Sequence, residues 1–217
     1  LANAGTTGFK DMTDKMSENK VRTMSGVMLS YTHIAQSVRN NDVGSFRQTG
    51  NEFDMAIRSK GYFMVQTPDG KFLTRNGHFI RDNNGSIVTA AGNYPVLNIT
   101  GSPITIPHTV SKVLINADGT IYGNDGQSLG KVGVFVVDDN QKGIRCIGNN
   151  LLATSDVPKP YQEAVLTQYG IEESTVSPVK ASTELIKTLR HYEMAQKVIN
   201  EVEQMSKRMI NASVRNV

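Results

Sequence analysis

The C-terminal part of the chain contains a long stretch that can only be accommodated as a helix. Residues 179–214 contain neither glycine nor proline, the residues that most often end a helix. Apolar side chains recur there at steps of three or four residues, which places them on one helical face. About 30 helical residues extend roughly 45 Å, more than a small neighbouring domain covers. The members of this apolar stripe are Leu185, Leu189, Tyr192, Ala195, Ile199, Val202, Met205 and Met209.

We therefore predict a C-terminal assembly helix over residues 179–217, with the stripe as its packing interface. A stripe of this length requires a partner helix, from the N-terminal part of the protein or from a neighbouring subunit. Packing within the monomer is the alternative. Without its partner the helix is expected to be partly disordered or to pack on another chain.

Residues 46–155 have the pattern of short β-strands joined by tight turns. Tyr62–Gln66 and Phe72–Thr74 are rich in β-forming residues and flank Pro68–Gly70, which predicts a hairpin. Similar patterns surround turns at Asp82–Gly85, Asp118–Gly119 and Asn124–Gly126, and an apolar strand is predicted over Val132–Val137. The spacing of these strands favours an antiparallel, β-rich outer domain.

The remaining segments are predicted from weaker signals. Residues 1–45 show no sustained period and are expected to form a short helical or extended arm, the remnant of a terminal helical domain. The chain begins at Leu1 without methionine, and we expect an N-terminal helix to precede it. Pro158 and Pro160 indicate a linker over 156–178. The predicted fold class is mainly β with helical termini.

The composition disfavours several classes of protein. The net charge is +3, from 23 basic and 20 acidic side chains, which does not suggest a nucleic-acid partner. No stretch is long and apolar enough to span a bilayer, and no signal peptide is visible. Cys146 is the one cysteine, which excludes an internal disulfide, and we expect it to be a small buried apolar residue.

No catalytic, cofactor-binding or metal-binding site is predicted. Asp82–Gly85 resembles a fragment of a calcium loop, but the twelfth position is Asn93 where such a loop needs glutamate, so a turn is expected. The four histidines lack metal-ligand spacing. Gly130 and Lys131 lack the rest of a phosphate-binding loop.

Several segments, taken in order, resemble motifs of the flagellar rod and hook axial protein family. The segments are Leu1–Lys10, Gln48–Ile57, Gly61–Gly70, Thr74–Phe79, Pro103–Pro107, Tyr169–Val179 and Arg190–Met194. Six or more weak matches in the right order make a specific resemblance that covers nearly the whole chain. The motif positions singled out are Asn3, Thr7, Gly8, Phe9, Gly50, Asp54, Gly61, Phe63, Arg75 and Gly77.

The sequence departs from the family pattern at a few positions. Ser59 stands where the family usually has glycine, and Thr175 and Ser177 replace two asparagines before the C-terminal helix. These departures affect the details of turns. The compact segment from Gly92 to Val137 favours a proximal-rod member of the family, with a distal-rod subunit as the alternative.

The resemblance implies a structural protein, not an enzyme. A rod subunit is exported unfolded by the flagellar type III apparatus, without a cleaved signal peptide, and polymerises helically in the periplasm. It then forms part of the drive shaft that transmits torque from motor to hook. Its expected partners are copies of itself, adjacent rod subunits and the export apparatus, with no small-molecule substrate, nucleic acid or membrane insertion.

Two other classes of function are alternatives on the residues alone. A periplasmic or surface β binding module needs a concave aromatic face, and this chain has no tryptophan and only scattered tyrosines. A small hydrolase needs convergent Ser, His and Asp or paired carboxylates, which the sequence does not bring together.

Overall fold

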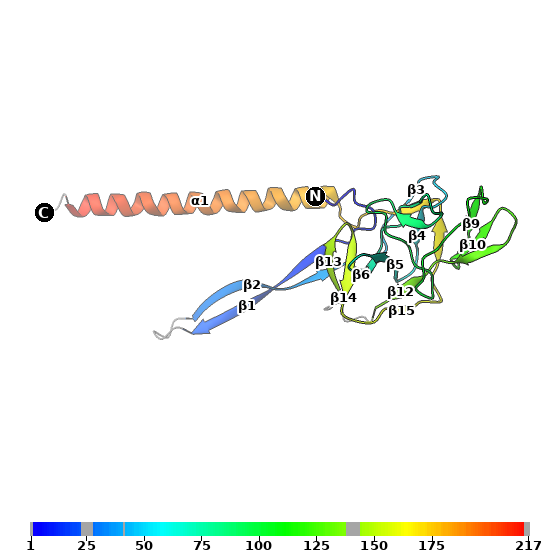
Figure 1. Ribbon diagram of the computed structural model, residues 1–217. Coiled ribbons are helices and arrows are strands. Elements are labelled where there is room, and N and C mark those ends of the chain that lie inside the picture. Colours follow the sequence, from blue (N-terminus) through cyan, green and yellow to red (C-terminus); the bar gives the residue numbers. More distant parts are fainter. Residues whose placement is uncertain (1, 23–27, 41, 138–143, 215–217) are drawn as a thin grey trace. The chain divides into compact units, whose positions relative to one another are not determined.

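The computed structural model describes residues 2–22, 28–40, 42–137 and 144–214 (Figure 1). Two compact units make up the chain, a body over residues 2–176 and a C-terminal unit from Ser177 onward. Each unit is described by itself. Residue 1 of the first family motif and residues 215–217 of the predicted assembly helix lie outside the described residues.

The C-terminal unit is one long helix, α1, over Pro178–Val214. Ser177 caps it, since its Oγ accepts a hydrogen bond from the amide of Lys180 at 3.3 Å. Pro178 follows as the first helical residue, where its missing N–H costs nothing. The helix predicted over 179–214 is thereby confirmed. In the described ranges, no helix is both long enough and apolar enough to cross a membrane.

The N-terminal arm is an antiparallel hairpin of β1, Met12–Arg22, and β2, Met28–Arg39. Its register runs from Met12 opposite Arg39 to Arg22 opposite Met28, and it shifts between Lys15 and Met16. Of the two conformations expected for residues 1–45, the extended one is therefore observed. A helix is not found in the described part of this segment, in keeping with its lack of a sustained helical period.

The centre of the body is a six-stranded antiparallel sheet in the order β13-β14-β6-β5-β12-β15. The predicted hairpin is confirmed as β5 and β6, with Thr67 opposite Gly70 at its turn. The strand predicted over Val132–Val137 is β12. The strands are β5 Tyr62–Thr67, β6 Gly70–Thr74, β12 Val134–Val136, β13 Ile144–Gly148, β14 Leu151–Thr154 and β15 Lys159–Pro160.

Smaller sheets surround this centre. The turn at Asp82–Gly85 joins a two-stranded pair, and the turn at Asp118–Gly119 lies in a three-stranded sheet ordered β11-β10-β9, as the sequence predicts. The strands are β7 Phe79–Arg81, β8 Ile87–Thr89, β9 Val113–Ile115, β10 Thr120–Gly123 and β11 Ser128–Lys131.

The segment expected as a linker over 156–178 is incorporated into the body. Its strands β16, Leu166–Gln168, and β17, Gly170–Glu172, pair with β4, Met55–Ile57, and β3, Phe46–Gln48, respectively. Both pairings are antiparallel. The segment that begins the β-rich part, β3 and β4, is thus hydrogen-bonded to the segment that ends it, β16 and β17, just before α1.

The core of the body lies on both faces of β5. Phe63 and Val65 belong to the larger apolar cluster, whereas Met64 belongs to a smaller one on the other face. The rings of Phe63 and Phe79 meet edge to face, 5.1 Å between centroids. A strand that is buried on both sides fixes the positions of its neighbours, including the loop from Arg75 to Gly77.

At Gly77 this loop packs closely against the backbone of Met55. A Cβ added at Gly77 would lie 1.6 Å from the carbonyl oxygen of Met55, whose amide bonds to the Gly77 carbonyl at 3.0 Å. Gly77→Ala should therefore lower the free energy of unfolding by about 3 kcal/mol, because two backbones must separate. Gly5→Ala is the control, since no atom lies within 4 Å of its added Cβ. Urea denaturation followed by tyrosine fluorescence measures both, and equal midpoints would contradict the prediction.

Candidate functional site

The predicted stripe on α1 presents a continuous apolar surface. Its members are exposed along the helix, from 52% for Leu189 to 65% for Met209. Two rows with seven-residue spacing make up most of it, one of Leu185, Tyr192 and Ile199, the other of Ala195, Val202 and Met209. Leu189 and Met205 flank these rows. Such a pair of rows is the arrangement that packs against another helix as knobs into holes.

Charged residues lie mainly outside the two rows. Lys187 pairs with Glu184 at 3.3 Å, and Lys207 pairs with Glu203 at 4.0 Å, all four side chains being well exposed. Exposed pairs of this kind contribute little to stability. The helix thus carries the apolar stripe on one face and most of its charges elsewhere, where Ile186 and Met194 are also exposed.

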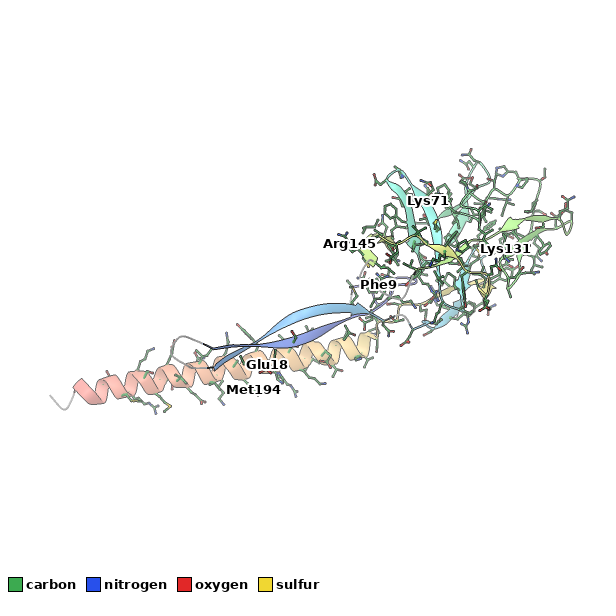
Figure 2. The ribbon with its side chains drawn as sticks, turned by 90° about the horizontal axis from the view of Figure 1, so that it is seen from below. Phe9, Glu18, Lys71, Lys131, Arg145 and Met194 are labelled. Atoms are coloured by element: carbon green, nitrogen blue, oxygen red, sulfur yellow. The ribbon has the colours of Figure 1, made fainter. Side chains whose placement is uncertain are left out.

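One buried charge cluster, formed by Lys10, Arg75 and Glu172, includes the motif residue Arg75 and is bonded to the motif residues Gly8 and Gly61. The described body places Asn3 on the surface, Thr7 and Phe9 half-buried, and Gly8 buried. Asp54, Gly61, Phe63, Arg75 and Gly77 are buried, whereas Gly50 is exposed in a turn with a φ of 77°. Figure 2 shows the side chains of the molecule, with Phe9 in the body.

Glu172 is the centre of the cluster. One carboxylate oxygen accepts hydrogen bonds from Lys10 Nζ and, at 2.8 Å, from the amide of Gly44. The other accepts from Arg75 Nε at 2.6 Å. The residues Lys10, Arg75 and Glu172 are 6%, 5% and 2% exposed, so the ion pairs are shielded from water. Each charge therefore depends on the others.

Arg75 uses its remaining donors on backbone carbonyls. Its Nη1 donates to Gly61, and its Nη2 donates to Ile57 at 2.9 Å and to Ser59 at 2.8 Å. The guanidinium thereby connects the chain between β4 and β5 to the carboxylate of β17. Ser59, a departure from the family pattern, contributes through its carbonyl, which any residue supplies.

Gly8 allows the N-terminal segment to approach this cluster. Its amide donates to the Glu172 carbonyl at 2.8 Å, and a Cβ at Gly8 would lie 2.5 Å from the Arg75 backbone. Gly8 has a φ of 68°, a conformation that favours glycine. Lys10 follows at once and reaches Glu172 from this side. The motif around Gly8 thus positions a charge.

The pKa of Glu172 reflects two opposed effects. Burial alone raises the pKa, but the charge of Arg75 and the hydrogen bonds from Lys10, Gly44 and Arg75 outweigh it, so the pKa falls below the ordinary 4.5. Burial lowers the pKa of Lys10 below its ordinary 10.5, and the attraction of Glu172 offsets this in part. The carboxylate form of Glu172 is the one that the fold stabilises.

Asp54, a second buried motif residue, organises a turn. Its carboxylate accepts hydrogen bonds from Thr49 Oγ1 at 2.5 Å and Asn51 Nδ2 at 3.1 Å, and it contacts His78 Nδ1 at 2.7 Å. Buried carboxylates with this many partners hold a local structure together. His78 is thereby placed in a structural contact.

The turn predicted at Asp82 is confirmed, whereas the burial predicted for Cys146 is not. Asp82 forms a turn, its Oδ1 accepting from the amides of Asn84 and Ser86, as the sequence predicts. Cys146 is exposed, so the prediction of a buried cysteine is wrong. It lies on β13, an edge strand of the central sheet whose residues from Arg145 to Gly148 are all exposed, so neither face of the strand is covered there. Among the described residues, no three potential metal-ligating side chains gather in one place.

Lys10 and Glu172 lie within the segments that resemble family motifs, but the sequence alone does not predict a role for either. Their partners lie 162 and 97 positions away along the chain, beyond the range of periodicity or turn signals. The charged groups of the cluster bond to one another and to nearby backbone groups. The cluster thereby joins the N-terminal segment to β17, from which the chain continues to α1.

Comparison with known proteins gives consistent matches. A family model described as "Flagellar hook protein FlgE/F/G D1 domain" matches residues 56–123, and one described as "Flagellar basal body rod FlgEFG protein C-terminal" matches residues 167–212. The flagellar basal-body rod protein FlgF of Mesorhizobium japonicum is 32% identical, over 89% of this chain and 80% of the relative. FlgF of Caulobacter vibrioides is 33% identical, over 95% and 86%. FlgG of Bacillus subtilis is 28% identical, over 97% and 89%.

Removing the charge of Glu172 should destabilise the body strongly. Glu172→Gln leaves Lys10 and Arg75 buried without a counter-charge, which costs about 3–5 kcal/mol of unfolding free energy. The neighbouring Glu173→Gln breaks an exposed pair with Arg47, at 3.4 Å, and should cost at most about 1 kcal/mol. Urea denaturation of both variants decides the matter. Similar losses in the two variants would show that the buried cluster is not special.

The same carboxylate should make stability depend on pH. Because the pKa of Glu172 is lower in the folded than in the unfolded chain, its contribution is complete above the ordinary 4.5 and is lost as the pH falls through the folded value. We expect the unfolding free energy to fall as the pH drops below 4.5. Glu172→Gln should show a shallower decline over this range, and parallel curves for the two proteins would contradict the assignment.

Proposed function

The chain belongs to the FlgE/F/G family of flagellar hook and basal-body rod proteins, and we propose that it is a subunit of the proximal rod. It is a structural component of the rod, as the relatives named FlgF and FlgG are. Two FlgF relatives, at 32% and 33% identity, are more similar to it than four FlgG relatives, at 27–30%, while a third FlgF relative is 28% identical. This difference favours the proximal position over the distal one.

The observation that carries the proposal is the exposed stripe on α1. Burial of a large aliphatic side chain gains about 1.5–3 kcal/mol. Association costs about 4–15 kcal/mol in lost freedom, so several such side chains in one row offset it. We infer that the rows around Tyr192 and Val202 pack against helices of adjacent subunits. The full proposed interface is Leu185, Leu189, Tyr192, Ala195, Ile199, Val202, Met205 and Met209.

Repetition of one such contact would build a helical assembly. A helix face that meets a different surface on the next subunit gives a heterologous interface, and heterologous interfaces that do not close produce filaments. In this proposal the terminal helices form the inner part of the rod, and the β-rich body makes outer, lateral contacts. The partners are copies of this chain and adjacent rod subunits.

The proposal includes export and location. A subunit assembled in the periplasm reaches it unfolded through the flagellar type III apparatus. The chain has one cysteine and therefore no internal disulfide to reduce before unfolding, which suits this route. The proposed role requires no catalysis, cofactor or metal.

Charges placed on the stripe should abolish assembly. Leu189→Asp combined with Ile199→Asp buries two carboxylates in the proposed helix contact, and we expect at least a tenfold fall in rod-associated subunit, about 1.4 kcal/mol or more. Immunoblots of purified basal bodies and swimming in soft agar measure the effect. Both residues are exposed on α1, so the body should keep its stability.

The matched control places the same charges on the other side of α1. Thr183→Asp with Gln204→Asp also adds two carboxylates, at positions a multiple of seven apart and outside the two apolar rows. This variant should assemble and swim normally. Normal assembly of the stripe variant, or equal loss in both, would overturn the proposed interface.

A further inference from the structure

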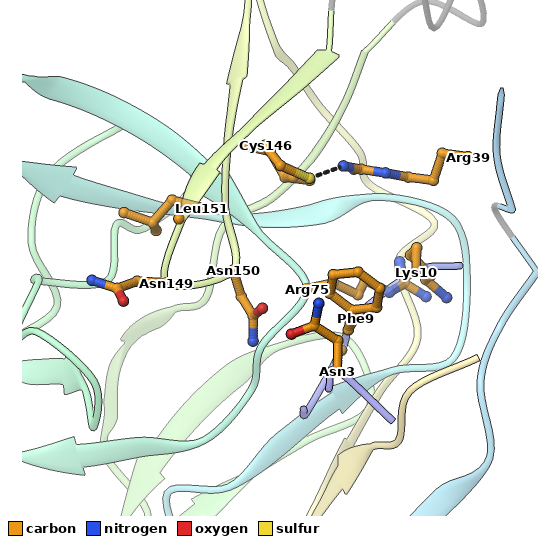
Figure 3. A pocket seen from close by; sticks show the side chains of 12 residues that line it. Asn3, Phe9, Lys10, Arg39, Arg75, Cys146, Asn149, Asn150 and Leu151 are labelled. Atoms are coloured by element: carbon orange, nitrogen blue, oxygen red, sulfur yellow. Dashed lines mark hydrogen bonds between the residues drawn. The ribbon is translucent and has the colours of Figure 1, made fainter. Parts of the chain in front are cut away.

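A second feature of the body lies next to the charge cluster and contains an arginine, Arg39, that the cluster does not use. A pocket of about 260 Å³ lies where the N-terminal segment, the base of the β1–β2 hairpin and the β13–β14 turn meet. Asn3, Phe9, Arg39 and Cys146 are among its lining residues (Figure 3). The figure shows Arg39 reaching toward Cys146 from the end of β2. The pocket is contained within the body.

Arg39 is the unusual residue of this pocket. Its Nη2 donates to Cys146 Sγ at 2.7 Å, and sulfur is a weak acceptor. Its Nη1 is buried and has no hydrogen-bond acceptor among the described residues. A buried donor without a partner is costly, and a charged one more so. The guanidinium therefore retains unused capacity for an oxygen acceptor.

The charge of the lining points to an anion. Lys10, Arg39 and Arg75 all line the pocket, and none of the described lining residues is an aspartate or glutamate. Lys10 and Arg75 are paired with Glu172, outside the lining, whereas Arg39 has no carboxylate partner among the side chains that the structure describes. The positive charge at Arg39 is thus unbalanced.

The shape of the bound anion is indicated by the guanidinium of Arg39 and by the apolar residues that line the pocket. The planar fork of arginine matches the two oxygens of a carboxylate. Phe9, Leu151 and Leu152 supply apolar surface beside it. An acidic side chain covers such surface with its methylene groups, whereas a free inorganic anion leaves it wet.

We propose that this pocket binds a side-chain carboxylate, with Arg39 as its principal ligand, supplied by a neighbouring rod subunit. The source of the carboxylate rests on the proposed function, because only assembly brings another chain to the pocket. The binding chemistry itself concerns the isolated protein and is tested separately.

The first test uses Cys146 as a built-in reporter, since it lines the pocket, is exposed and is the single cysteine. Sodium propionate has the stem and carboxylate of a glutamate side chain. It should slow the reaction of Cys146 with a thiol reagent in a saturable manner, whereas propionamide and sodium chloride of equal ionic strength should not. Protection by none of the three, or equal protection by propionamide or chloride, overturns the carboxylate site. Equal protection by sodium phosphate also overturns it, in favour of a general anion site.

Variants of the arginine identify the ligand. Arg39→Gln should raise the propionate concentration for half-protection about tenfold, because a charge-assisted hydrogen bond is lost. Arg47→Gln removes an arginine whose side chain is exposed and should change nothing. If Arg39→Gln does not fold, Arg39→Lys keeps the charge without the fork and should show a smaller loss. An unchanged half-protection concentration in the folded Arg39 variant removes Arg39 as the ligand.

The second test concerns the source of the carboxylate. In purified basal bodies Cys146 should react at least several-fold more slowly than in the isolated subunit. Equal rates would show the pocket to be open in the rod and would overturn a neighbouring subunit as the source. Failure of the proposed function is recognised differently, since the subunit would then be missing from basal bodies.

Discussion

Glu172 and its two cationic partners determine how the body is connected. A carboxylate buried to this extent persists only with charges and donors placed around it, and here they come from Lys10, Arg75 and the amide of Gly44. Replacing such a cluster as a whole with apolar residues is often neutral for stability, whereas removing one member leaves the others buried and unpaired. The three charges come from the N-terminal segment, the end of β6 and β17, so their bonds hold these segments together.

The local structure of the body was largely predictable, because its hairpins depend on turn residues adjacent in sequence. Asp69 and Gly70 mark the β5–β6 turn, and α1 follows from its apolar steps and the absence of glycine and proline. Ser177 also shows why a departure from a motif was harmless, since serine and asparagine cap helices about equally well. Hydrophobic periodicity and turn residues are local signals that act over a few residues, and they are sufficient to predict these hairpins and α1.

The pairings between distant segments were not predictable in the same way. Leu151 pairs with Thr74, and Gly170 pairs with Gln48. No sequence signal in these strands indicates which strand each will pair with. The hairpin of β1 and β2 has no turn signal as clear as Asp-Gly, and Cys146 is exposed because its edge strand, β13, is uncovered along most of its length. At the candidate sites, the α1 stripe could be read from sequence. The roles of Lys10 and Glu172 could not, since burial of a charge depends on which segments meet.

The pairing of β17 with β3 has a mechanical consequence for a protein of a rotating shaft. Tension along α1 reaches the body first at Thr175, which is hydrogen-bonded to Phe9 and Asp11, and then at Glu173, whose amide donates to Ser45. The side-chain bonds of Glu172 to Arg75 and Lys10, together with the antiparallel ladder to β3, resist next. Because Arg75 is bonded in turn to the carbonyls of Ile57, Ser59 and Gly61, the load spreads at once over several segments. Force along the helix is therefore resisted by bonds to several segments of the body, and not by the pairing of one strand alone.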